Sequence, residues 1–252
     1  MPPTINYVYG SVHCYAFRVP AIKDSRANDV HKWLQIPHVF EFKAFDIVVI
    51  AASAGGISAL GAFLSGLPAC FPAPVVIAQH LSPRSIYESR LDCVLERRTA
   101  LNVKWADDGE IPRAGTVYLS PQDRLTVIDS SYGALCTTRT SGLQRTTPRA
   151  NPLFDSAAEY YGHRTLALVL SGALEDGANG AMKVKEAGGR VLVQSYLSAQ
   201  FDDMPKAAMK NTRVALAFDP LALAHVVVTL VMAPGASDWF RVSDQRNLIM
   251  EG

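Results

Sequence analysis

A short apolar segment followed by a pair of glycines, residues 46–56, constrains the fold of this chain most strongly. Asp46 is followed by Ile-Val-Val-Ile-Ala-Ala, a run typical of a strand buried on both faces of a parallel sheet. Apolar residues then recur at helical spacing from Ile57 to Leu64. The strand is therefore predicted to turn directly into a helix. Ser53 lies at that turn, on the carboxyl edge of the sheet, where open α/β sheets bind ligands.

Ser53 has two interpretations at this position. A serine at such a turn can point its hydroxyl into a cleft, while the helix N-terminus supplies backbone N–H groups and the positive end of a dipole. Serine is also a favoured helix N-cap, which is a purely structural role. The surrounding sequence, Ala51-Ala-Ser-Ala-Gly55, does not match the Gly-x-Ser-x-Gly nucleophile elbow. This segment alone leaves both interpretations open.

The alternation of buried strand and helix continues through residues 45–232. Strands are predicted at 73–80, 101–105, 165–171, 190–194 and 213–217, and helices at 85–98, 151–161, 178–187, 204–211 and 219–232. Three short strands, 116–120, 124–129 and 134–138, are separated by turn signals and predict antiparallel hairpins attached to the main sheet. The order predicts an α/β fold with a doubly wound, largely parallel sheet and helices on both faces.

The two flanking segments lack this pattern. Prolines interrupt residues 1–44, and no helical or alternating pattern persists there, so they are predicted to form an N-terminal extension for which disorder is one interpretation. Residues 233–252 are weakly patterned and are predicted to form a C-terminal tail. The chain therefore divides into an extension, one domain at 45–232 and a tail.

Composition argues against several classes of protein. The formal net charge of +1 gives no positive excess of the kind that indicates nucleic-acid binding. Apolar runs fall short of the roughly 20 residues needed to span a bilayer, and the N-terminal sequence does not resemble a signal peptide. The 4 cysteines form no C-x-x-C pair, which predicts reduced thiols in a cytoplasmic protein and no metal site or disulfide framework.

Three reactive side chains are predicted to meet at one edge of the sheet. Ser53, His80 and Asp176 each follow a buried strand, and right-handed crossovers bring the ends of parallel strands to the same edge. In acyl transfer an imidazole takes the serine proton, a carboxylate orients the imidazolium, and backbone N–H groups hold the oxyanion. The set indicates a serine hydrolase, because such triads are defined by geometry and not by their order along the chain.

Each member of this set also has a structural interpretation. His80 could be a strand-end histidine with its hydrogen bonds satisfied, and Asp176 could cap the helix that follows it. His163, after a helix end, and His225, inside the last helix, are alternative bases, but neither is predicted at the strand edge. The coincidence of three suitable residues at one edge favours the triad.

A polar loop before the helix at 151–161 carries three arginines, Arg139, Arg145 and Arg149. One interpretation is a loop that is simply solvated. The other is a docking edge for an acidic partner or substrate, because clustered positive charge attracts acidic surfaces. The sequence leaves both interpretations open. Asn151 and Pro152 then predict a helix start, with asparagine as N-cap and proline at the first helical position.

Five motifs resemble the catalytic domain of the chemotaxis protein-glutamate methylesterases. They are IVVIAASAGG at 47–56, VVIAQH at 75–80, DG and GTVYLSP within 108–121, LFDSAAE at 153–159 and LSGALEDGANG at 170–180, with Gln194 and Met204-Pro205 in support. The resemblance covers about residues 45–232. It implies a doubly wound α/β domain without a cofactor that hydrolyses γ-glutamyl methyl esters on chemoreceptor signalling helices and often deamidates glutamines there. It also implies Ser53 as nucleophile, His80 as base and Asp176 as the orienting carboxylate.

The chain departs from the family pattern around the predicted oxyanion region. The usual opening glycine of the serine motif is Ala51, and the usual threonine after the serine is Ala54. The family's Thr-Gly-Met-Gly corresponds to Ser-Gly-Ala-Leu at 171–174, so the methionine that helps to shape the oxyanion region is absent. Leu174 also lacks the backbone freedom of glycine. The residues predicted to form the oxyanion and substrate region are Ala54, Gly55, Ala173 and Leu174.

Further departures lie outside that region. The family tends to show arginine and aspartate where Thr147 and Asn151 stand, with Arg149 as a substitute for the arginine, and Leu125 stands where the family has a histidine. Residues 1–44 are too few for the receiver domain of about a hundred residues that usually precedes this catalytic domain. We therefore expect activity that is constitutive or set by a separate partner.

The sequence thus supports a first interpretation and two alternatives. The first is a cytoplasmic methylesterase-type serine hydrolase that acts on methylated chemoreceptor helices or a related signalling protein. The second is a regulatory or binding module that keeps the fold but turns over poorly, which the Ala173-Leu174 departure favours. Nucleotide binding at residues 53–56 is the third, although neither G-x-G-x-x-G nor a P-loop is present there.

Overall fold

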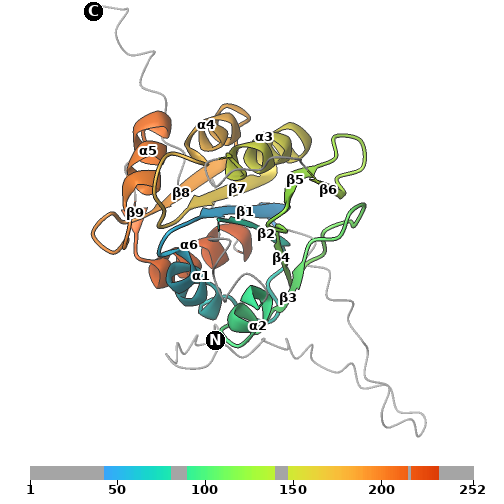
Figure 1. Cartoon of the computed structure of the whole chain (residues 1–252), viewed down its shortest axis with the longest axis horizontal. Helices are drawn as coiled ribbons and strands as arrows, with labels where there is room; N and C mark the ends of the chain where they lie inside the picture. Colours follow the sequence, from blue (N-terminus) through green and yellow to red (C-terminus); the bar gives the residue numbers. More distant parts are fainter. Residues whose placement is uncertain (1–42, 81–89, 140–146, 215–216, 233–252) are drawn as a thin grey trace, which may run out of the picture. The chain divides into compact units, whose positions relative to one another are not determined.

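The structure, a computed structural model, describes residues 43–80, 90–139, 147–214 and 217–232. The chain divides into two units, residues 1–39 and 40–252, and every described residue belongs to the second. Most of the predicted N-terminal extension and the whole predicted tail lie outside the described residues. Within the second unit, seven strands form one sheet and two strands form a separate hairpin (Figure 1).

Every adjacent pair of strands in the main sheet is parallel. In spatial order the strands are β3 (Asn102–Trp105), β4 (Thr116–Leu119), β2 (Val75–Gln79), β1 (Ile47–Ala52), β7 (Thr165–Val169), β8 (Arg190–Gln194) and β9 (Ala217–Phe218). Strands β5 (Arg124–Ile128) and β6 (Leu135–Arg139) form the antiparallel hairpin. The predicted doubly wound, largely parallel sheet with an antiparallel section is confirmed.

Helices cover both faces of the main sheet. One face packs against α1 (Gly56–Ser65), α2 (Leu91–Glu96) and α6 (Pro220–Met232), and the other against α3 (Ala150–Tyr161), α4 (Ala178–Glu186) and α5 (Asp203–Thr212), as Figure 1 shows. A short 3-10 helix, Gly162–Arg164, links α3 to β7. Each face therefore has its own apolar core.

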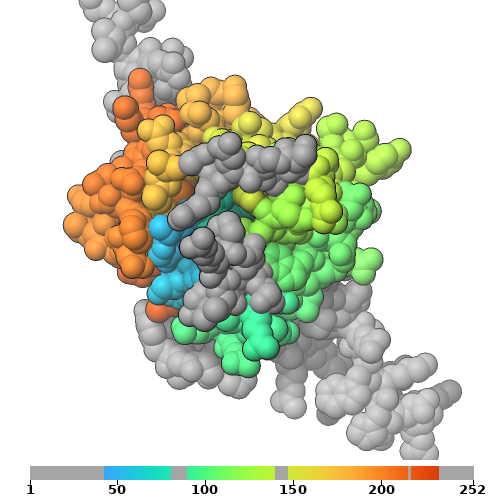
Figure 2. Space-filling model, in the orientation of Figure 1, coloured from blue at the N-terminus to red at the C-terminus, as the bar shows by residue number. Residues whose placement is uncertain are grey.

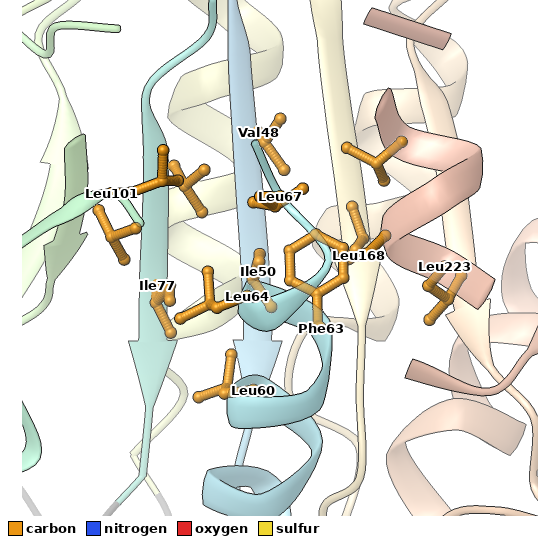
Figure 3. Packing of buried hydrophobic residues seen from close by; sticks show 14 of the residues in the cluster. Val48, Ile50, Leu60, Phe63, Leu64, Leu67, Ile77, Leu101, Leu168 and Leu223 are labelled. Carbon is orange, nitrogen blue, oxygen red and sulfur yellow. The ribbon is translucent and has the colours of Figure 1, made fainter. Parts of the chain in front are cut away.

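Alternate residues of β1 belong to the two cores. Val48 and Ile50 pack in the core under α1 and α6, whereas Ile47 and Val49 pack in the core under α3, α4 and α5. Figure 3 shows Val48 and Ile50 among side chains of α1 such as Phe63. Successive side chains of a strand point to opposite faces, so a strand covered on both faces is apolar throughout. This explains the unbroken apolar run in the sequence.

Strand β1 lies at the point where the direction of winding reverses. It pairs with β2 on one side and with β7 on the other. The chain leaves β1 through α1 to β2, and it later enters β7 through α3. In open α/β sheets the crevice at such a switch point is where ligands bind. The segment that follows β1 begins with Ser53, and Ser171 is the second residue after β7.

Some predicted elements were wrong in detail. The segment predicted as the first strand of the hairpins is β4, which is a parallel member of the main sheet between β3 and β2. Its residues from Val117 to Leu119 are all buried, so it has no solvated face of the kind that a hairpin strand shows. The helix predicted at 85–98 is observed as α2 alone, and residues 81–89 lie outside the described part. The strand predicted at 213–217 is observed later, as β9.

Candidate active site

Ser53 lies in the tight turn between β1 and α1. The turn is possible because Gly55, the N-cap of α1, has a φ of 72°, and no side-chain hydrogen bond caps the helix. The alternative of Ser53 as the N-cap is therefore wrong. The Ser53 N–H donates to Ser171 O at 3.0 Å, and Ser53 O accepts from Gly56 N–H at 2.9 Å. The backbone of Ser53 is fixed, while its hydroxyl makes no hydrogen bond to another described residue.

Gln79, the last residue of β2, joins the turn at Ser53 to the neighbouring strand end. Its side chain is buried, and Nε2 donates to Ser53 O at 2.9 Å and to His80 O at 2.7 Å. One amide group thus holds the backbones of both residues at the carboxyl edge. Sequence reasoning missed this role, although a buried-strand run that ends in a glutamine was a visible signal.

His80 and Asp176 meet at the same edge. His80 Nε2 lies 3.0 Å from Asp176 Oδ2, and the two side chains are 17% and 8% exposed. The distance suits a hydrogen bond, but the ring is not fully aligned for one. Catalytic hydrogen bonds often tighten only when substrate is bound. The contact occupies Nε2, so Nδ1 is the ring nitrogen that remains for proton transfer.

Asp176 also accepts hydrogen bonds from the N-terminus of α3. Oδ2 accepts from the N–H groups of Arg149 and Ala150, both at 2.8 Å, and Oδ1 accepts from Asn151 N–H at 3.0 Å. Burial opposes ionisation of this carboxyl, but His80 and the three backbone N–H groups together hold its pKa below the usual value. The carboxylate therefore stays charged beside the imidazole. Asp176 caps α3, not the helix that follows it.

The segment after β7 packs closely against Ser53. A Cβ on Gly172 would lie 2.9 Å from Ser53 Cβ and 2.0 Å from Met204 Sδ, so no side chain fits there. Ser171 Oγ lies 2.8 Å from Ala54 O and accepts from Phe201 N–H at 3.0 Å, which links three loops. In Figure 2 the blue surface of the first described residues adjoins the orange surface of residues near 200. The turn that contains Ser53 is therefore held on both sides.

Comparison with known proteins identifies the family of this chain. The CheB methylesterase family matches residues 48–227. The chain belongs to the CheB methylesterase family. The crystal structure of the Thermotoga maritima CheB methylesterase catalytic domain superposes with a TM-score of 0.69 at 31% identity, covering 74% of this chain and 99% of that domain. The prediction of the family from sequence motifs is confirmed.

Curated relatives in the CheB family differ in length. The Thermotoga maritima protein-glutamate methylesterase/protein-glutamine glutaminase is 34% identical over 66% of this chain but only 48% of its own length. The second such protein of Anaeromyxobacter dehalogenans is 36% identical and is likewise covered over 47% of its length. A Leptospira interrogans protein with a name of the same kind is 32% identical and is covered over 95% of its length. The chain thus spans about half of the first two relatives and nearly all of the third.

Two of the departures from the CheB pattern, Ala173 and Leu174, lie in the segment between β7 and Asp176. Leu174 replaces a glycine and has a φ of 68°, in the left-handed region that disfavours a leucine, and its side chain is 60% exposed. Ala173 beside it is half-buried. The N–H groups of Ala54, Gly55 and Ala173 make no hydrogen bond to another described residue. These groups face no competing acceptor in the described part of the chain.

Asn151, another departure from the family pattern, does not cap its own helix as predicted. The helix α3 begins at Ala150, and its N-cap is Arg149. Asn151 Oδ1 instead accepts from the N–H groups of Gly177 and Gly180, at 3.1 and 2.8 Å, at the start of α4. The prediction of an N-cap role was right about the chemistry of asparagine and wrong about the helix.

Two of the three arginines predicted to form a docking edge, Arg139 and Arg149, are among the described residues. Arg139 is exposed on β6 and pairs with Asp123 at 2.9 Å. The backbone of Arg149 contacts Asp176, and its Nη1 donates to Pro121 O at 3.3 Å. Arg145 lies outside the described residues. Of the two described arginines, Arg149 is the one that contacts Asp176.

The two alternative bases lie away from the Ser53 turn. His163 is exposed in the 3-10 helix before β7, at the opposite edge of the sheet, and His225 is exposed within α6. Among the described residues, no group of three or more His, Cys, Asp or Glu side chains could hold a metal ion. No described helix combines the length and the apolar character needed to cross a membrane.

Proposed function

We propose that this chain is a serine hydrolase that cleaves glutamyl methyl esters on a protein. One observation carries the proposal: the carboxylate of Asp176 lies 3.0 Å from the His80 imidazole, at the same sheet edge as the turn that holds Ser53. Membership of the CheB methylesterase family supports the same chemistry. Ser53 is the nucleophile, His80 the base and Asp176 the orienting carboxylate.

In the first half-reaction Ser53 Oγ attacks the ester carbonyl carbon and its proton passes to His80. Asp176 stabilises the imidazolium that forms. The tetrahedral intermediate then collapses, the carbon–methoxy bond breaks, and the imidazolium gives its proton to the leaving oxygen, so methanol departs. A glutamyl ester of Ser53 remains.

In the second half-reaction water replaces methanol. His80 takes a proton from the water as it attacks the acyl carbon, and Ser53 leaves with that proton, which releases a glutamate carboxyl group. In both steps the oxyanion needs backbone donors. Ser53 N–H and Gly172 N–H are engaged by Ser171 O and Phe201 O. The N–H groups of Ala54 and Gly55, at the positive end of α1, are the donors that we assign.

The substrate that fits this chemistry is a methylated chemoreceptor signalling helix or a related signalling protein in the cytoplasm. Several relatives carry both methylesterase and glutaminase in their names. Hydrolysis of a glutamine amide uses the same acyl intermediate, with ammonia as the leaving group. We therefore propose deamidation as a second reaction of the same site, with Ala173, Leu174 and Arg149 on the substrate side.

Methanol release from a methylated chemoreceptor tests the proposal. We expect release by the parent protein, and loss by at least a thousandfold in Ser53→Ala. Ser58→Ala is the matched control, because Ser58 is exposed on α1, one turn from the nucleophile. A fluorophosphonate probe should label the parent and the control but not Ser53→Ala. Labelling of Ser53→Ala at the parental rate would refute Ser53 as the nucleophile.

A further inference from the structure

The N-terminus of each of the helices α3 and α4 is capped by a side chain from the N-terminal region of the other helix. Asp176, which lies two residues before α4, accepts the N–H groups of Arg149, Ala150 and Asn151 at the start of α3. Asn151, in the first turn of α3, accepts the N–H groups of Gly177 and Gly180 at the start of α4. Helix N-termini leave their first N–H groups without intrahelical partners. Here the N-terminal region of each helix supplies a side-chain acceptor for the free N–H groups of the other.

The bond from Gly177 to Asn151 acts directly on the position of Asp176. Gly177 follows Asp176 in the chain, so its N–H belongs to the peptide group that carries the Asp176 carbonyl carbon. Asn151 Oδ1 holds that peptide at 3.1 Å, and the 2.8 Å bond to Gly180 ties the same oxygen to the first turn of α4. A Cβ on Gly180 would lie 3.0 Å from the backbone of Asn151, so the two helices approach closely.

The Asn151 amide oxygen thus accepts two hydrogen bonds, one from the peptide after Asp176 and one from the first turn of α4. We infer that Asn151 is a positioning residue for the Asp176–His80 pair: it fixes the peptide after Asp176, and Asp176 in return fixes the first turn of α3. The role rests on the proposed hydrolase function, because it matters through the orientation of His80.

Loss of a purely structural cap and loss of a positioning residue are expected to have different effects on stability and on kcat. Loss of a structural cap lowers stability and leaves the turnover number of the folded molecules unchanged. Loss of a positioning contact lowers kcat with little change in KM, because misplacement by about 1 Å can reduce a rate by about a hundredfold. The two roles are therefore separable by steady-state kinetics on folded protein.

The experiment compares four variants of the full chain. Asn151→Ala removes the acceptor, Asn151→Asp keeps it, and Asn151→Gln displaces it by one methylene. Asn179→Ala is the matched control. Asn179 lies on α4, the helix whose start Asn151 caps, and its side chain accepts a hydrogen bond from Asn211 at 3.0 Å in an exposed position. Kinetics on a glutamyl methyl ester, urea unfolding, and the downfield proton resonance of the imidazole that faces Asp176 are measured for each.

We expect Asn151→Ala to lower kcat by about tenfold or more, with KM within about twofold, and to shift or broaden the imidazole resonance. Asn151→Asp should return kcat to within about threefold of the parent, and Asn179→Ala should match the parent throughout. If Asn151→Ala does not fold, the comparison of Asn151→Asp with Asn151→Gln carries the test, and Asn151→Gln should be the slower.

Two results would overturn the inference. One is an Asn151→Ala protein with parental kcat and resonance, and the other is an Asn151→Asp protein as slow as the displaced or truncated variants. Failure of the proposed function has a different signature. In that case the parent itself would not hydrolyse the ester, while the imidazole resonance would still move in Asn151→Ala and not in Asn179→Ala, which would support the positioning role alone.

Discussion

The two ends of the β1–β7 strand pair differ in how they use an aspartate. At the amino end Asp46 precedes β1 and Arg164 precedes β7, and the guanidinium binds both carboxylate oxygens and Lys43 O. At the carboxyl end Asp176 faces His80 and three backbone N–H groups. Both aspartates lie beside the same two strands, which makes them a matched pair.

The pKa alone does not distinguish these ends. Burial opposes ionisation of Asp46, but Arg164 and Lys43 more than offset it and lower its pKa, and the pKa of Asp176 is also lowered against its burial. What differs is the partner. A guanidinium keeps its proton at all ordinary pH values and forms a static link, whereas an imidazole can take and give a proton near neutrality. The amino end therefore only joins strands, and the carboxyl end can do chemistry.

Replacing each aspartate with asparagine separates the two ends most sharply. Asp176→Asn removes the charge that stabilises the imidazolium, so ester turnover should fall about ten-thousandfold. Asp46→Asn should leave turnover within about twofold and lower the free energy of unfolding by about 0.5–1 kcal/mol, as expected of a partly exposed ion pair. Initial rates and urea titrations measure both. Similar losses of turnover in the two variants would refute the contrast.

Two glycines, one at each end of β7, extend the comparison to steric effects. Gly172→Ala would drive a methyl group against Ser53 and Met204, so we expect turnover to fall about a hundredfold and stability to fall by about 1–3 kcal/mol. Gly162, at the amino end, has a φ of 54°, and a Cβ there would lie 4.0 Å from Ala187 O, an ordinary van der Waals contact. Gly162→Ala should cost stability through backbone strain of about 1–3 kcal/mol and leave turnover unchanged. Normal turnover in Gly172→Ala would contradict the close packing at Ser53.

Acid and salt should affect the two aspartates differently. Both have a folded-state pKa below the unfolded value, so each contributes stability that is present above about pH 4 and is lost as the pH falls through the folded pKa. The destabilisation caused by either asparagine variant should therefore shrink between pH 7 and pH 3.

High salt should reduce the effect of Asp46→Asn more than that of Asp176→Asn, because the Asp46 side chain is the more exposed, 29% against 8%. Urea titrations at two pH values and two salt concentrations provide the measurement, and an Asp46 effect indifferent to salt would be evidence against this account.

Two residues with left-handed backbone give the smallest expected effect. Leu174 at the carboxyl edge and Arg213 at the C-cap of α5 have φ values of 68° and 55°. Replacement of either by glycine should raise the free energy of unfolding by about 0.5–1 kcal/mol. Only Leu174→Gly should also raise turnover of a glutamyl methyl ester, by about two- to tenfold, if the loop shapes the oxyanion site. A slower Leu174→Gly enzyme would indicate that the leucine suits the loop to another substrate.

The sequence by itself determined the fold class and the candidate residues. A short apolar run rich in β-branched residues is typical of a strand covered on both faces, and the run before Ser53 is β1, with alternate residues in the two cores. His80 and Asp176 were predicted at one edge because parallel strands end together, and the structure brings them to 3.0 Å. The roles of these residues in catalysis stay predictions. Such inferences succeed because they need only local periodicity and the handedness of crossovers.

Only the tertiary structure decided which groups satisfy one another. Asp176 caps α3 and Asn151 caps α4, whereas Asn151 was predicted to cap its own helix and a cap on the following helix was the structural alternative for Asp176. The sequence also does not reveal that one Gln79 amide binds both Ser53 O and His80 O. A hydrogen-bonding side chain pairs with whichever unpaired N–H or carbonyl the packing brings within 3 Å or so. That choice depends on how elements more than twenty residues apart approach each other, which no local pattern encodes.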